Sequence, residues 1–354
     1  MASDYTCTLK EETLQLAIKE LNENPKTRIL EVKAFRERIL QYTGLQPRTD
    51  TEFLLRFLRA RKFDQERAFQ LYLSYYRMRK EDPKIFTGLK PSCVRHMYQS
   101  AMSFPHTHRD REGCQIYLIF PGRLDTSHYT IEEAFKVEFL NVNKMIEDEE
   151  NQVRGFTLLI DYRDFSMSHF MMMNFDFAKR VSKLWQDAFP ARFKACLLVN
   201  VPSFVDIVIT LFTQFLKSKL AQRVHNIGSD WKKLHEYIDP SCLPVDYGGT
   251  LPGLPTNESW VEEMMKCDEK MEKESKFGFV DDTLGKDSDR KQQDAITNMY
   301  CIPVLLLENI SPVINIVIIV IVVVVIIIII ISSSSSSSNS RSSISLLYTG
   351  TAGS

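Results

Sequence analysis

Gly155-Phe156-Thr157-Leu158-Leu159-Ile160-Asp161 is one of two short apolar segments that decide the fold of this chain; the other is Ala195-Cys196-Leu197-Leu198-Val199-Asn200. Both have the length of a β-strand and the nearly continuous apolar character of strands that are buried on both faces. A helix-type segment follows each of them. Because strands that alternate with helices pair in parallel through crossover connections, the sequence predicts an α/β fold with a mostly parallel sheet.

The residues before these strands divide into two regions. Residues 8–90 carry helical patterns and predict a small all-helical N-terminal lobe, with its strongest helices from Phe53 to Arg61 and from about Asp64 to Glu81. Residues 91–254 are expected to form the α/β domain.

Two further elements are expected inside the α/β domain. A strand is predicted from Gln115 to Phe120, and a helix from Ile131 to Glu147. The long apolar helix that follows the second diagnostic strand ends before Tyr247-Gly248-Gly249, which is expected to close the domain.

The residues after the α/β domain are of two kinds. Residues 255–300 are polar and predict a loosely attached tail with one short helix from Glu258 to Lys273. Residues 301–354 are of low complexity, with sixteen consecutive Ile and Val residues from Ile316 to Ile331 and then a serine run. Two interpretations stand for this last region: an artefact of translated simple-repeat DNA, or a C-terminal membrane anchor.

Composition argues against several classes of protein. The 354 residues contain 44 Lys+Arg and 45 Asp+Glu, so the chain lacks the net positive charge that is typical of nucleic-acid-binding proteins. The seven cysteines are scattered and never form a C-x-x-C pair, which argues against zinc and disulfide frameworks and favours a reducing compartment. The N-terminus lacks the pattern of a secretory signal, so we expect a cytoplasmic protein.

No catalytic or cofactor motif accompanies the predicted sheet. The phosphate-binding glycine motifs, the H-E-x-x-H motif and the G-x-S-x-G motif are all missing, so no enzyme, cofactor or catalytic residue is expected. The pair His106 and His108 lacks matching ligands, so no metal site is expected. Asp161 and Asp164 follow a strand where α/β enzymes place catalytic groups, and they remain the candidates for an enzymatic alternative.

A long amphipathic helix is predicted after the second strand. Its apolar residues recur at helical spacing and include Phe204, Ile207, Val208, Leu211, Phe212 and Phe215. Lys217, Lys219 and Arg223 lie at its C-terminal end, and Arg192 and Lys194 precede the second strand. Such a helix either packs on the sheet like any other or can leave it and lie at a membrane surface.

The apolar side chains of the two strands and of the helix between them could line a cavity. In the strands, Phe156, Leu158 and Ile160 share one face, and Cys196 lies on one face of the second strand. The preceding helix presents Val181, Leu184, Trp185 and Phe189. The alternative interpretation of each of these residues is ordinary core packing.

Several motifs in residues 10–254 resemble the CRAL-TRIO lipid-transfer family. The resemblance is carried by Phe53-Leu54-Leu55-Arg56-Phe57-Leu58-Arg59-Ala60-Arg61-Lys62-Phe63-Asp64, by Asp187-Ala188-Phe189-Pro190-Ala191-Arg192-Phe193 and by Leu243-Pro244-Val245-Asp246-Tyr247-Gly248-Gly249. Within the family, the chain is most similar to the branch of the clavesins, cellular retinaldehyde-binding protein and α-tocopherol transfer protein. Two segments depart from that branch: Asn174-Phe175 stands where it usually has Thr-Pro, and His225 to Ser229 where it usually has His-Gly-Asn-Asn.

The resemblance implies a CRAL-TRIO lipid-binding fold with a pocket under a mobile lid helix. It adds Val142 to the pocket residues Phe156, Leu158, Ile160, Val181, Leu184, Trp185, Phe189 and Cys196. It also implies a phosphoinositide-binding cluster on Arg61, Arg192, Lys194, Lys219 and Arg223, beside Lys217.

The function implied by this resemblance is non-enzymatic. It is the binding and intermembrane transfer of a tocopherol-, retinoid- or phospholipid-like lipid, with docking on membranes that contain phosphatidylinositol bisphosphate. The alternative is a trafficking adaptor of the clavesin type, with coat or adaptor proteins as partners. Both place the protein in the cytoplasm, peripherally on endosomal or Golgi membranes.

Overall fold

The computed structural model describes residues 5–172, 177, 180–181, 184–206, 209, 222–254 and 256–280. Its strands are β1 (Leu45–Gln46), β2 (Ser103–Arg109), β3 (Gln115–Ile119), β4 (Phe156–Asp161), β5 (Phe193–Val199), β6 (Val224–Gly228) and β7 (Gly278–Phe279). Its α-helices are α1 (Glu11–Leu21), α2 (Arg28–Leu40), α3 (Thr51–Ala60), α4 (Gln65–Glu81), α5 (Pro83–Phe86), α6 (Arg95–Gln99), α7 (Ile131–Met145), α8 (Glu149–Arg154), α9 (Met167–Met171), α13 (Trp231–His235), α14 (Glu258–Met265) and α15 (Asp268–Glu274). Short 3₁₀ segments are η1 (Pro91–Val94), η2 (Pro121–Arg123), η4 (Pro240–Cys242) and η5 (Val245–Tyr247), and η3 (Leu184–Ala188) is π-helical.

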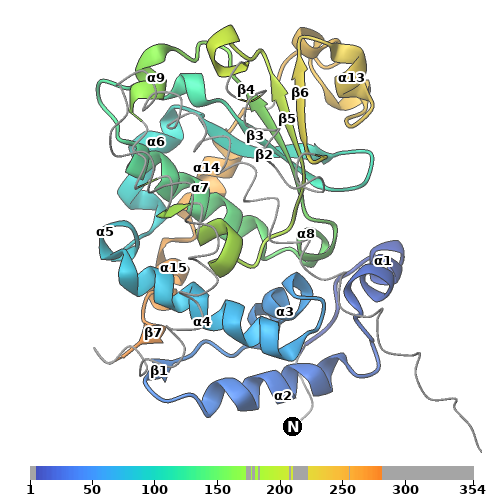
Figure 1. Cartoon of the computed structure of the whole chain (residues 1–354), viewed down its shortest axis with the longest axis vertical. Helices are drawn as coiled ribbons and strands as arrows, with labels where there is room; N and C mark the ends of the chain where they lie inside the picture. Colours follow the sequence, from blue (N-terminus) through green and yellow to red (C-terminus); the bar gives the residue numbers. More distant parts are fainter. Residues whose placement is uncertain are drawn as a thin grey trace, which may run out of the picture.

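The main sheet has the order β2-β3-β4-β5-β6 (Figure 1). Strands β3 to β6 are parallel, and only β2 pairs antiparallel, with β3. The predicted α/β fold with a mostly parallel sheet is therefore confirmed. The edge strands β2 and β6 were not predicted, because β2 contains Pro105 and two histidines, and β6 mixes Val and Ile with His, Asn and Gly.

Each face of the sheet is covered by a different layer. On one face, Leu159 of β4 and Leu197 of β5 pack with Leu234 of α13 and with Tyr247. On the other face, Leu158 and Cys196 belong to a larger apolar cluster that includes α7, the residues around η3 and the N-terminal helices. One continuous core therefore joins the helical lobe to this second face of the sheet.

The N-terminal helices lie beneath the sheet in the view of Figure 1. Their start signals are local: the Asp50 side chain accepts from the backbone N–H of Phe53, and Asp64 accepts from that of Arg67, each at 3.0 Å. The Tyr75 ring of α4 contacts the Phe189 ring beside η3, with 6.2 Å between centroids. This contact carries the core of the lobe into the α/β domain.

A buried ionic cluster joins the same two regions. Arg59 of α3 is fully buried and forms ion pairs of 2.9 Å with Glu23 and with Glu149 of α8. Gln152 accepts a further hydrogen bond from Arg59 at 2.8 Å. Because a buried charge is stable only when it is paired, these contacts fix the lobe against α8.

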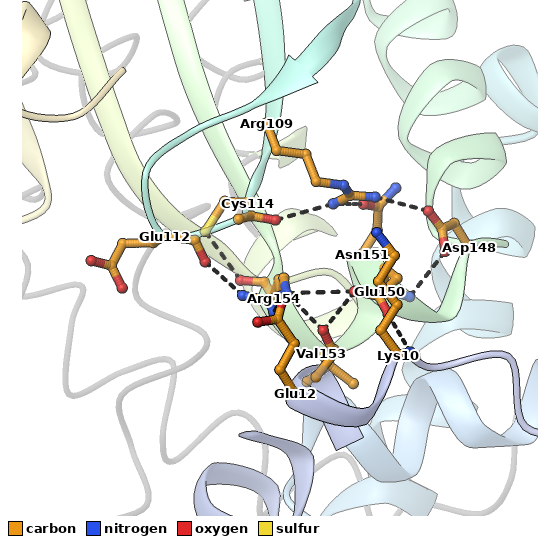
Figure 2. Close-up of polar contacts among 12 residues, drawn as sticks. Lys10, Glu12, Arg109, Glu112, Cys114, Asp148, Glu150, Asn151, Val153 and Arg154 are labelled. Carbon is orange, nitrogen blue, oxygen red and sulfur yellow. Dashed lines mark hydrogen bonds and ion pairs between the residues drawn. The ribbon is translucent and has the colours of Figure 1, made fainter. Parts of the chain in front are cut away.

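A second polar junction lies where α1 meets α8 and the loop between β2 and β3. Figure 2 shows Arg154 of α8 pointing toward Glu12 of α1, with 2.9 Å between Nη2 and Oε1. Arg109 of β2 donates to Asn151 at 2.8 Å and to Asp148 at 3.0 Å. The N-terminal helix α1 is therefore held by α8, which is itself tied to β2 through Arg109.

The structure corrects the expectation of a loosely attached tail for residues 256–280. The predicted single helix is two helices, α14 and α15, whose Met264 and Met271 side chains are buried in the main core. The segment then pairs as β7 with β1 of the N-terminal lobe. In Figure 1 this orange segment runs from the sheet region to the lobe and so connects both.

Candidate functional site

The predicted strand residues of the pocket lie on one face of the sheet. Leu158 of β4 pairs with Cys196 of β5, and Ile160 pairs with Leu198, in a parallel register. Since alternate residues of a strand share a face, Phe156, Leu158 and Ile160 point the same way. All belong to the cluster that also contains the helices around η3. The structure therefore brings these residues together, as the sequence suggested.

The predicted helix residues of the pocket lie opposite this face, in the same cluster. Val142 belongs to α7, whereas Val181, Leu184, Trp185 and Phe189 lie in and around η3, and all are buried. The Trp185 ring contacts Phe189 at 4.8 Å between centroids, and Phe193 at 5.9 Å. The lining that the sequence proposed is thus a contiguous apolar set, and its contact with a cargo stays a prediction.

The predicted lid is described only at its beginning. Phe204 stacks on Phe165 at 6.4 Å and meets Phe170 edge-on at 6.1 Å. The buried side chains in this turn are Val205 and Ile209, which the predicted apolar stripe did not include. The other predicted lid residues, Ile207, Val208, Leu211, Phe212 and Phe215, lie outside the described residues.

The predicted basic residues lie together where β5 and β6 begin: Arg192 and Arg223 directly precede these strands, and Lys194 is the second residue of β5. The backbone N–H of Cys196 donates to the carbonyl of Arg223 at 2.8 Å, and the Arg223 guanidinium donates to the carbonyl of Phe193 at 3.2 Å. Burial, and then the charge of Arg192, lower the pKa of Arg223. Arg192, Lys194 and Arg223 therefore form a basic edge, the name used below for these three residues.

A carboxylate that was not predicted to have a role sits on this basic edge. Glu20 of α1 accepts from Arg192 Nη2 and from Lys194 Nζ, both at 3.1 Å. Partial burial would raise the pKa of Glu20, but the charge of Lys194 and the hydrogen bonds from both cations hold that pKa below its usual value. Glu20 therefore stays ionised and offsets part of the positive charge.

Of the remaining predicted basic residues, Arg61 lies within the described part of the chain, whereas Lys217 and Lys219 do not. Arg61 ends α3, next to Lys62, whose carbonyl accepts from Asn22 at the end of α1. The C-terminal end of α1 thus contacts both the Arg61 region and the basic edge. Burial, and then Arg67, lower the pKa of Arg61 to about 10.

Asp161, one of the two candidates for an enzymatic alternative beside Asp164, makes several contacts within the fold. Its carboxylate accepts from the Tyr247 hydroxyl at 2.6 Å and from Asn200 Nδ2 at 2.8 Å. It also forms an ion pair of 3.0 Å with Arg163. These contacts tie the ends of β4 and β5 to the turn around Tyr247. In that turn a Cβ atom on Gly249 would lie 2.0 Å from the Leu243 carbonyl oxygen, which explains the glycine.

A buried polar cluster that was not predicted from the sequence lies beside the predicted pocket. The Tyr117 hydroxyl of β3 donates to Glu138 Oε2 of α7 at 2.6 Å and lies 3.0 Å from Ser103 Oγ. The only sequence signal is an acid between Val137 and Phe139 on a helix with an apolar face. Tyr117 pairs in register with Leu158, so this cluster adjoins the predicted lining.

In the part of the chain that the structure describes, no helix combines the length and apolar character needed to cross a membrane. Over those same residues, no group of three or more His, Cys, Asp and Glu side chains is arranged to hold a metal ion.

Comparison with known proteins gives matches over both the N-terminal helical lobe and the α/β domain. The CRAL/TRIO domain matches residues 100–249, and the CRAL/TRIO N-terminal domain matches residues 13–74. A human protein described as alpha-tocopherol transfer protein-like is 37% identical over 271 residues, which cover 76% of this chain and 79% of that protein.

Clavesins are similar over a slightly shorter range. Clavesin-1 of Xenopus laevis is 35% identical over 69% of this chain and 74% of its own length. Human clavesin-2 is 34% identical over 69% of this chain and 76% of its own length. These matches include the strands and helices that carry the candidate pocket.

Proposed function

This chain belongs to the CRAL/TRIO family, and on that premise we propose that it binds a hydrophobic lipid and transfers it between membranes without transforming it. The observation that carries the proposal is the apolar face formed by Phe156, Leu158, Ile160 and Cys196 opposite the aromatic residues around η3. Burying a lipid chain is worth about 0.8 kcal/mol per CH₂ group. Such a site therefore needs few polar contacts to hold a lipid.

The proposed cargo is a tocopherol-, retinoid- or phospholipid-like molecule. The name of one relative, alpha-tocopherol transfer protein-like, supports the first of these classes. The segment that begins at Phe204 would act as the lid over the cargo, since Phe204 already packs on Phe165 and Phe170. The engagement of the Asp161 carboxylate by Tyr247, Asn200 and Arg163 supports a role without catalysis.

We further propose that the protein docks on phosphoinositide-containing membranes through the basic edge, with Arg61, Lys217 and Lys219 as additional contacts. A basic residue near an anionic membrane contributes about 1 kcal/mol. A handful of them is therefore enough for reversible docking. The protein would then reside in the cytoplasm and associate peripherally with endosomal or Golgi membranes.

Native mass spectrometry of the full-length protein purified from eukaryotic cells, followed by lipid extraction, tests the transfer function. We expect one chemically unchanged lipid bound in stoichiometric amount. A protein that is empty yet binds phosphoinositide vesicles would contradict cargo transfer and support the adaptor function with coat or adaptor proteins. A bound lipid that is converted during incubation would instead support the enzymatic alternative.

A further inference from the structure

The orientation of one buried amide fixes the polar cluster beside the candidate pocket. Asn141 Oδ1 accepts from Trp260 Nε1 at 2.9 Å and from the Tyr98 hydroxyl at 3.1 Å. An indole nitrogen can only donate, so the oxygen of the amide must face Trp260. The amide nitrogen of Asn141 therefore faces Tyr117, to which it donates at 3.0 Å.

This orientation determines where the single proton of the Tyr117 hydroxyl goes. Its oxygen already accepts from Asn141, and the nearest acceptor for its proton is Glu138 Oε2 at 2.6 Å. A carboxylate is a stronger acceptor than the hydroxyl of Ser103, which lies at 3.0 Å. Tyr117 thus donates its one hydroxyl proton to Oε2 of Glu138 and has no second proton to donate to Oε1.

The second oxygen of Glu138 is left without a partner. Oε1 has no accessible surface, and within the described residues no group hydrogen-bonds to it. The residue as a whole keeps some accessible surface, so the burial concerns the carboxyl group itself. Desolvation raises the pKa of Glu138 to about 7, although the nearby hydroxyl groups of Ser103 and Tyr117 oppose this shift.

The position of Glu138 relates this oxygen to the candidate pocket. On α7, Phe135 lies three residues before it and Val142 four residues after it, so the three side chains share one helix face. Across the sheet, its partner Tyr117 pairs with Leu158, which pairs with Cys196. Glu138 is therefore an unsatisfied carboxyl group bordered on two sides by proposed lining residues.

We propose that the lipid cargo carries a free alcohol or phenol hydroxyl group and that Glu138 Oε1 is its hydrogen-bond partner. The inference rests on the proposed function, because it names the chemistry of a cargo for that site. A hydroxyl group both donates and accepts, so it pairs with an ionised or a protonated carboxyl. A carbonyl group would pair only with the protonated form, and an amine would add a buried charge.

The first test identifies the cargo. Full-length protein is incubated with a total lipid extract of eukaryotic cells and isolated again, and the bound lipid is examined by mass spectrometry before and after silylation. We expect a bound lipid that gains a silyl group at a free hydroxyl. A bound lipid without a free hydroxyl would overturn the inference and leave lipid transfer intact, whereas an empty protein would overturn both.

The second test places that hydroxyl at Glu138. The recovered lipid and its O-methyl ether, in which the hydroxyl proton is replaced by a methyl group, are compared in competition binding. We expect the wild-type protein to prefer the free hydroxyl by about tenfold, because the ether cannot donate to Oε1. Equal affinities would overturn the inference without requiring any variant to fold.

Two variants complete the second test. In Glu138→Leu the preference for the hydroxyl over the ether should vanish, while in Glu132→Leu, in the first turn of the same helix, it should persist. A preference that persists in Glu138→Leu would mean that the hydroxyl is recognised elsewhere. Cys196→Trp, which should exclude either ligand, shows independently whether the lipid occupies the proposed pocket.

Discussion

Glu20 and Lys194, which are 174 residues apart in sequence, form an ion pair with 3.1 Å between Oε2 and Nζ. The same Glu20 oxygen also pairs with Arg192, which is largely buried. The N-terminal lobe thus supplies an anion to the basic edge that we propose for membrane docking. A phosphoinositide headgroup that binds there would compete with Glu20 for the same two cations.

Substituting Glu20 should therefore strengthen membrane binding. Glu20→Gln removes one negative charge from the basic edge, and a charge near an anionic surface is worth about 1 kcal/mol, or roughly fivefold in affinity. The measurement is cosedimentation with vesicles containing phosphatidylinositol bisphosphate. Glu262→Gln on α14 makes the same charge change at an exposed site and should leave binding unchanged. Unaltered or weaker binding of Glu20→Gln would show that Glu20 does not compete.

Lys194 and Arg192 should differ when each is replaced. Lys194 is partly exposed, so Lys194→Ala should weaken vesicle binding about fivefold with little loss of stability. Arg192 is 9% exposed and also donates to the Val153 carbonyl, so Arg192→Ala should lower the free energy of unfolding by about 2–4 kcal/mol.

Vesicle cosedimentation measures the effect of each substitution on membrane binding, and urea unfolding measures its effect on stability. Lys232→Ala, an exposed lysine of α13 on the other side of the sheet, is the control for charge. If Lys194→Ala and Lys232→Ala bind vesicles equally well, the basic edge is not the docking site.

The sequence predicts some elements of the fold because their causes are local. Strands β4 and β5 are mostly apolar, a composition that is typical of strands buried on both faces. The edge strand β6 is only partly apolar, and its pairing depends on the neighbouring β5. The polar composition of residues 256–280 likewise conceals Met264 and Met271, whose burial depends on contacts far away in the sequence.

In the candidate site, too, some residues follow from local sequence patterns, whereas others depend on contacts between residues far apart in the sequence. Most of the apolar lining follows from strand alternation and helical spacing, and Val142 follows from the family resemblance; the structure places all of these residues in one apolar cluster. The pairing of Glu20 with the basic edge spans more than 170 residues and leaves no local pattern. Glu138 does leave a signal, an acid on an apolar helix face, but its partner Tyr117 lies 21 residues away on β3.

A bulky substitution tests whether the proposed lining faces a cargo. Cys196 is fully buried on the apolar face, and Cys196→Trp should reduce lipid retention at least tenfold while vesicle binding persists. Overpacking a solid core costs about 1–3 kcal/mol, whereas an indole placed in space meant for cargo costs less. Cys93→Trp, at an exposed cysteine, controls for the added tryptophan. Undiminished lipid retention by Cys196→Trp would exclude this face as the lining.

Glu138 should make the stability of the cargo-free protein depend on pH. Burial raises its pKa from 4.5 to about 7 in the folded protein. Between these two values the unfolded chain releases a proton that the folded protein keeps, so the unfolded state binds fewer protons. The free energy of unfolding therefore falls as the pH rises through this window. Because one pKa unit corresponds to about 1.4 kcal/mol, the total fall is on the order of 3 kcal/mol.

Urea unfolding of the wild-type protein and of Glu138→Gln at about pH 5 and pH 8 measures this contribution. The amide of the variant does not titrate. Between pH 5 and pH 8 the free energy of unfolding of Glu138→Gln should therefore fall less than that of the wild-type protein. Glu132→Gln, in the first turn of α7, should keep the wild-type dependence. If Glu138→Gln and the wild-type protein respond identically to pH, the carboxyl of Glu138 is already satisfied in the folded protein, and a hydroxyl-bearing cargo is not needed to complete it.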